Sequence, residues 1–197
     1  MRTVDHLSLG KYLANSFLSD KPTACQKAFI LGNVYPDINF FTYFRGAINS
    51  KELKGHNYEN AKECIKHIEE KLEGREYFGV SDYFMLGILV HYTADSFTFP
   101  HNKCFEGTLK MHVEYEDKLH FKFLEKLNDM KEKDIQIYPQ GESFYDKIIS
   151  LHSNYLLNIG DMENDLTYIF KAARIAVYKI SRAYETKNFK EDWRYVS

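Results

Sequence analysis

The segment 82–97, DYFMLGILVHYTADSF, constrains the fold most, because it is apolar on nearly every side of a helix and yet contains a histidine and an aspartate. Ser81 precedes the segment as an N-cap residue, and Pro100 follows it as a helix terminator. A helix that is apolar all round is buried, so the segment predicts a central helix packed against several others. Burial of His91 and Asp95 without a cation would cost several kcal/mol, and a bound metal ion would remove that cost.

Helical spacing of apolar residues recurs along the rest of the chain, and only 135–138 hints at extended structure. The 4 prolines and 10 glycines are too few turn signals for a many-stranded sheet protein. Gly32 is expected to end the second helix, and 33–37 to form a loop before and around Pro36. The sequence therefore predicts an all-α fold, a single-domain helical bundle over 1–197, with helices at 7–18, 22–31, 58–72, 82–97, 106–131, 142–158 and 163–185.

Length and charge exclude several classes of protein. The 197 residues contain 26 Lys and Arg against 28 Asp and Glu, a net charge of −2 that gives no attraction for nucleic acid. The longest uninterrupted apolar stretch, 83–90, is far shorter than the roughly 20 residues that a membrane-spanning helix needs. Asp5 and His6 stand where a secretory signal would have its apolar stretch, so we expect a cytoplasmic protein.

Two pairs of a histidine and a carboxylate lie on either side of a further histidine, His101. His91 and Asp95 are four residues apart in one predicted helix, as are His112 and Glu116 in another. This spacing leaves both side chains on one face, with Cβ atoms about 5–6 Å apart, within reach of one metal ion. Because imidazole and carboxylate both suit zinc, the pattern H-x3-D-x5-H-x10-H-x3-E predicts a metal site. The alternative for each pair alone is an ion pair on an exposed helix.

Three more candidates precede this group: His6, Asp37 in YPD, and His56 in GHNYENA. Taken singly, Asp37 is typical of a turn or cap, His6 of a surface histidine, and His56 of a helix N-terminus. His120 continues the helix face of the last pair and is either a partner of the metal ligands or a packing residue. The aromatic run 39–44 predicts either a substrate pocket or core packing.

Taken in order, the eight residues read His, Pro-Asp, His, H-x3-D-x5-H, H-x3-E. This order resembles the zinc-dependent phospholipase C family, small all-helical bacterial enzymes with a trinuclear zinc site, and implies a bundle of that type. The resemblance runs from 6 to 116 and implies that Asp37 also orients or deprotonates the attacking water. It implies these zinc ligands: Asp37, His56, His91 and Asp95 for one ion, His101, His112 and Glu116 for a second, and Asp95 with His6 for a third.

The third site departs from the family pattern at the start of the chain. Secreted members of the family begin with a tryptophan whose amine and carbonyl chelate the third zinc, whereas this sequence begins Met1-Arg2 and its single tryptophan is Trp193. We therefore expect two or three zinc ions, with the third site either empty or completed by the Met1 amine. We expect no counterpart of the extra membrane-binding domain of the larger toxins.

The resemblance implies a zinc-dependent phosphodiesterase that cleaves a phospholipid, or a related phosphodiester, with a zinc-activated water. We expect no specific nucleic-acid partner and at most a peripheral contact with membranes. The first alternative is a phosphoesterase like the single-strand-specific zinc nucleases, which have a similar ligand order but typically end with aspartate where Glu116 stands here. The second alternative is a noncatalytic, metal-stabilised interaction module, which the apparent lack of a signal sequence favours.

Overall fold

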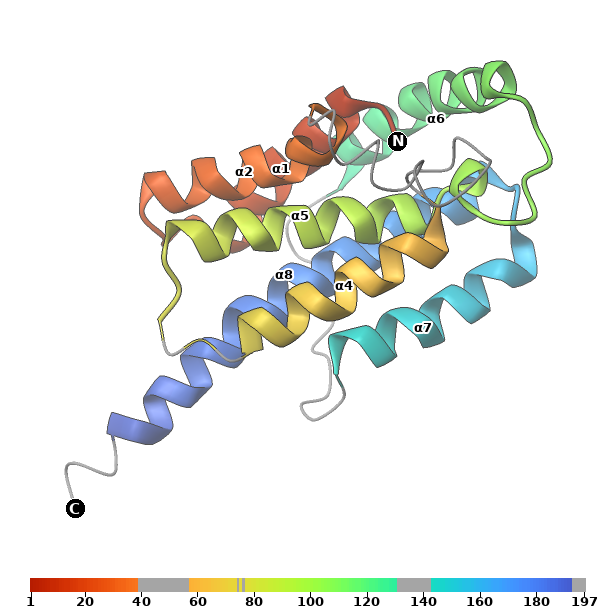
Figure 1. Cartoon of the computed structure of the whole chain (residues 1–197). Coiled ribbons are helices and arrows are strands. Elements are labelled where there is room, and N and C mark those ends of the chain that lie inside the picture. Colours follow the sequence, from red (N-terminus) through yellow and green to blue (C-terminus); the bar gives the residue numbers. More distant parts are fainter. Residues whose placement is uncertain (39–56, 74, 76, 131–142, 193–197) are drawn as a thin grey trace.

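A computed structural model of the chain describes residues 1–38, 57–73, 75, 77–130 and 143–192, without the side chains of 182–192. These residues form seven α-helices and two short 3₁₀ helices, η1 (Phe99–His101) and η2 (Leu156–Asn158). No strand occurs within the described ranges, which confirms the all-α prediction, whereas 135–138 lies outside them. The α-helices, drawn in Figure 1, are α1 (Thr3–Phe17), α2 (Thr23–Ile38), α4 (Tyr58–Glu73), α5 (Val80–Ser96), α6 (Leu109–Asp129), α7 (Phe144–Tyr155) and α8 (Met162–Asp192).

Helix α5 is the central helix that the apolar segment predicted. It packs against α2, α4 and α8, and most of its residues are buried (Figure 1). The helix begins at Val80, because the Asp82 carboxylate accepts a hydrogen bond of 2.8 Å from the Gly79 N–H. Ser81 is therefore inside the first turn and is not the predicted N-cap.

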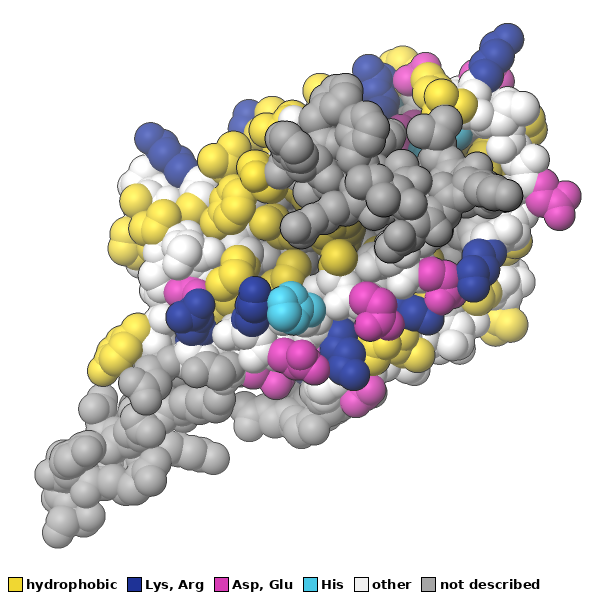
Figure 2. All heavy atoms as spheres, in the orientation of Figure 1, with side chains coloured by type: hydrophobic (Ala, Val, Ile, Leu, Met, Phe, Trp, Pro, Cys, Tyr) yellow, Lys and Arg dark blue, Asp and Glu magenta, His cyan; other side chains and the backbone are white. Residues whose placement is uncertain are grey.

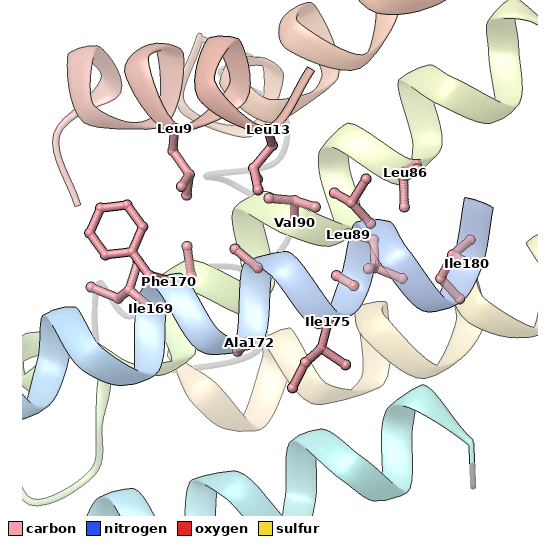
Figure 3. Packing of buried hydrophobic residues seen from close by; sticks show 14 of the residues in the cluster. Leu9, Leu13, Leu86, Leu89, Val90, Ile169, Phe170, Ala172, Ile175 and Ile180 are labelled. Carbon is pink, nitrogen blue, oxygen red and sulfur yellow. The ribbon is translucent and has the colours of Figure 1, made fainter. Parts of the chain in front are cut away.

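The hydrophobic core is one buried cluster to which all seven α-helices contribute. Figure 3 shows Leu9 and Leu13 of α1 directed at Val90 of α5 and at Phe170 of α8. This cluster agrees with a single-domain bundle, although the assignment of the whole range 1–197 to one domain stays a prediction. The core fixes α1, α5 and α8 relative to one another, and thereby fixes the residues at their ends.

The prediction that Gly32 ends a helix and that 33–37 form a loop is wrong, because α2 continues to Ile38. Gly32 serves a close approach between two helices instead. A Cβ atom added to it would lie 2.0 Å from the Phe84 carbonyl oxygen in α5, and one added to Gly87 would lie 2.1 Å from the Phe29 carbonyl oxygen in α2. Pro36, which has no N–H to donate, lies inside α2, two residues before the helix ends.

The surface agrees with the balanced charge of the sequence. Figure 2 shows acidic and basic side chains interspersed over the face that carries α4, so this face has no field of one sign. None of the described helices is both long enough and apolar enough to cross a membrane.

The contact between α2 and α5 predicts a strong effect of one added methyl group. We expect Gly87→Ala to lower the free energy of unfolding by about 1–3 kcal/mol, because the new Cβ meets backbone atoms that cannot rotate away. Gly79→Ala is the control, since its Cβ would meet nothing closer than 3.7 Å and its φ of −98° suits alanine. Urea denaturation measures both, and an equal loss of stability in the two variants would contradict this packing.

Candidate metal centre

The predicted site residues gather where the C-terminal end of α5 meets the ends of three other helices. His6 comes from the first turns of α1, Asp37 from the last turn of α2, and His101 from η1. The two pairs lie on α5 and on the first turns of α6, the latter capped by the Thr108 hydroxyl. Of the eight predicted residues, seven lie in this region, and His56 and the run 39–44 lie outside the described residues.

A first cluster consists of His6, His91 and Asp95, all of them buried. Asp95 Oδ1 lies 3.1 Å from His6 Nε2, and Asp95 Oδ2 lies 3.4 Å from His91 Nε2. The two imidazole rings stack with their centroids 3.9 Å apart. One potential ligand atom from each residue lies within 4.8 Å of the other two, which is close enough for a shared metal ion.

Asp37 lies at the edge of the first cluster, with Oδ1 3.6 Å from His91 Nε2. Its Oδ2 atom is buried and has no hydrogen-bond partner among the described residues. Burial raises the pKa of Asp37, and the nearby Asp95 carboxylate raises it further, although His6 opposes the shift. A buried carboxylate oxygen in this state is suited to a cation.

A second cluster consists of His101, His112 and Glu116, again with potential ligand atoms within 4.8 Å of one another. His112 Nε2 lies 3.0 Å from Glu116 Oε1, as the four-residue spacing predicted. His101 Nε2 lies 3.7 Å from Asp95 Oδ2, so Asp95 faces both clusters. His101 is buried, whereas His112 and Glu116 are partly exposed.

The amine of Met1 lies between the clusters. It is 2.7 Å from Asp95 Oδ1 and 2.9 Å from Glu116 Oε1, and it is fully buried. Burial by itself would lower the pKa of the amine, but the two carboxylates outweigh that effect and raise the pKa to about 11. Without a metal ion, the amine is therefore the cation that faces these two acidic side chains.

Hydrogen bonds at Nδ1 orient two of the histidines toward the centre. His91 Nδ1 lies 3.0 Å from the Asn33 carbonyl oxygen, which can only accept, so Nδ1 carries the proton. The Thr98 hydroxyl donates to the Asp95 carbonyl, so it accepts from His101 Nδ1 at 2.5 Å. Each Nε2 then presents a lone pair toward carboxylate oxygens, an arrangement that favours a metal ion between them.

A family model described as zinc dependent phospholipase C matches residues 5–162. The chain belongs to the zinc-dependent phospholipase C family. Comparison with curated proteins and comparison with solved structures gave no match. Membership makes zinc the expected metal for a site whose side chains are imidazoles and carboxylates.

Electrostatics in this family member favour the protonation states that bind zinc. Burial lowers the pKa of His101 to about 3 despite the opposing Asp95, so the imidazole is neutral at pH 7. Burial would raise the pKa of Asp95 and that of Glu116, but the Met1 ammonium and neighbouring histidines outweigh it and lower both. Both carboxylates are therefore ionised, as metal ligands must be.

Three supporting contacts were not predicted from the sequence. The Asn33 carbonyl contacts His91 and Asp5 contacts His120, each from a distant part of the chain, whereas Thr98 contacts His101 three residues away. Asp5 is buried, and its Oδ1 lies 2.5 Å from His120 Nδ1, so His120 joins α6 to the residue next to His6. Asp5 is not one of the predicted ligands, so a role of His120 as a partner of the metal ligands stays a prediction.

The end of η1 is held by a buried histidine whose titration gives a test of pH dependence. His152 Nε2 lies 2.8 Å from Asn102 Oδ1, and burial lowers the pKa of His152 to about 4. Because this value is below the usual 6.5, stability from His152 is present above pH 6.5 and is lost as the pH falls toward 4. We expect unfolding free energies, measured from pH 7 to 4, to fall less in His152→Gln than in the wild type.

The matched control is His67→Gln, which changes an exposed histidine of α4 and should keep the full pH dependence. The difference between the variants amounts to about 3 kcal/mol at most, because each pKa unit corresponds to roughly 1.4 kcal/mol. Identical pH profiles for His152→Gln and the wild type would show that His152 is not a buried neutral residue.

Proposed function

We propose that this family member is a zinc-dependent phosphodiesterase that cleaves phospholipids between glycerol and phosphate, or a related phosphodiester. Family membership supports zinc dependence and hydrolysis. The observation that carries the proposal is the position of Asp95, which belongs to the first cluster and whose Oδ2 also faces His101 of the second. Sites with two neighbouring metal ions are typical of phosphodiester hydrolysis.

In this proposal, two or three zinc ions are held by the residues that the sequence analysis named. The first cluster supplies His6, His91 and Asp95, with Asp37 beside them, and the second supplies His101, His112 and Glu116. His56 completes the predicted ligand set, and its place stays a prediction. The Met1 amine is the proposed further ligand of a third ion, because it already contacts Asp95.

Bound zinc would supply Lewis acidity toward a phosphoryl oxygen and would make water a stronger acid. The protein's own contribution would come from Asp37 and from the hydrogen bonds that hold the imidazoles. The Asp37 carboxylate, with its buried Oδ2, would orient the attacking water and accept its proton.

Metal content and turnover test this proposal together. Purified protein is expected to carry at least two zinc ions per chain and to hydrolyse a chromogenic phosphocholine diester, and chelation should lower both turnover and the thermal midpoint. Asp95→Ala should abolish turnover and lower stability, because it removes the carboxylate shared by both clusters. Metal analysis, a colorimetric assay and thermal unfolding measure these effects.

His67→Ala is the control variant, since this residue is exposed on α4 and should change neither zinc content nor turnover. Hydrolysis of single-stranded DNA in preference to the diester would favour the nuclease-like alternative. Folded protein that binds zinc but hydrolyses no phosphodiester would favour the noncatalytic module. Folded protein that binds no divalent metal would refute the ligand assignment.

An extension of the chain tests the Met1 amine as a ligand. Two residues added before Met1 would move the free amine away from Asp95 and Glu116. We expect the extended protein to lose one zinc equivalent and part of its turnover, while the second cluster keeps its ion. A His6→Ala variant should lose the same equivalent, so three zinc ions that survive both changes would remove Met1 and His6 from the site.

A further inference from the structure

Asp165 on α8 is a further carboxylate that is fully buried, and it lies outside both clusters. Its Oδ2 accepts hydrogen bonds from the Phe99 N–H at 3.0 Å and from the Tyr115 hydroxyl at 2.8 Å. Its Oδ1 accepts one from the Tyr155 hydroxyl at 2.7 Å. Among the described residues, these three donors, and no ion pair, stabilise the carboxylate.

The donors to Oδ2 belong to the two segments that carry the second cluster. Phe99 begins η1, which ends at His101, and Tyr115 stands in α6 directly before Glu116 and three residues after His112. One oxygen atom therefore connects the turn that presents His101 to the helix that presents the other two side chains. The Phe99 and Tyr115 rings also meet edge to face, with centroids 5.8 Å apart.

Stability alone does not account for a carboxylate at this position. Burial raises the pKa of Asp165 to about 6 even though three hydrogen bonds oppose the shift. A buried ionised carboxylate costs several kcal/mol unless hydrogen bonds replace its lost hydration. The geometric role, one acceptor atom for two separate segments, is what an apolar residue cannot provide.

We propose that Asp165 is a positioning residue that sets the distance between His101 and the His112–Glu116 pair and thereby the zinc affinity of the second cluster. This inference rests on the proposed function, because it assumes that the second cluster binds zinc. Residues that orient metal ligands in this way typically change metal affinity by about 10–100-fold when they are altered. Asp165 would touch neither zinc nor substrate.

Two tyrosines on the same carboxylate provide a matched pair of variants. Tyr115→Phe removes the hydrogen bond from α6, which carries two ligands of the second cluster, and retains the ring. Tyr155→Phe removes an equivalent hydrogen bond from α7, which carries none of the predicted ligands. Both changes remove one hydroxyl from a partner of Asp165, whereas only the first changes the connection to the second cluster.

The readout is zinc affinity, measured by competition with a chromophoric chelator on metal-free protein, together with the visible spectrum of the cobalt-substituted protein. We expect Tyr115→Phe to weaken one zinc site by about 10-fold or more and to alter the cobalt spectrum. Tyr155→Phe should match the wild type in both measurements. The thermal midpoint of the metal-free protein should fall in both variants.

A double-mutant cycle assigns the effect to the second cluster. In a His112→Ala background, where that cluster is already incomplete, Tyr115→Phe should change zinc binding no further. Equal zinc affinity in the two tyrosine variants, or a full effect of Tyr115→Phe in that background, would overturn the positioning role. Wild-type protein that binds no zinc would overturn the proposed function as well, whereas zinc binding without turnover would overturn the proposed function alone.

Discussion

The buried carboxylate of Asp95 is the group on which the arrangement of the helix ends depends. Its Oδ1 faces the Met1 amine and His6, and its Oδ2 faces His91 and His101. These partners come from the start of α1, from α5 itself and from η1, so an ionised Asp95 requires all three segments to end at the same place. At this end of the central helix, Asp95 is the one acidic side chain, and it is surrounded by groups that either carry positive charge or can share a metal ion.

The close contact between Gly32 and Gly87 positions residues of the metal centre, although neither glycine belongs to it. Because the backbones of α2 and α5 approach one another there, the end of α2 lies against the last turns of α5. The Asn33 carbonyl then reaches His91 Nδ1, and Asp37 reaches the opposite nitrogen of the same ring. A side chain at either glycine would separate the helices and move the carboxylate and the carbonyl away from His91. The packing of α2 against α5 therefore positions the groups that contact the His91 imidazole.

The features predicted from the sequence are those that depend on the spacing of residues within one helix. The all-α fold, the central position of α5, and the pairing of His112 with Glu116 depend on spacing within one helix, and the structure confirms them. The end of α2 was mispredicted, because glycine marks either a helix terminus or a close backbone approach, and one sequence does not distinguish the two. The contacts of Thr98 depend on where its hydroxyl proton points, and those of Asp165 depend on residues far apart in the chain. No sequence pattern predicts either kind of contact.

The carboxylates of this centre outnumber the cationic groups that contact them. Three carboxylates, from Asp37, Asp95 and Glu116, converge on a region where the Met1 ammonium is the cation that contacts two of them. His101 is neutral at pH 7, and the lone pairs on its Nε2 and on that of His91 add electron density to the same region. Burial is the largest cause of the raised pKa of Asp37, and the Asp95 carboxylate raises it further. Divalent cations would balance the carboxylate charge that the single ammonium leaves uncompensated.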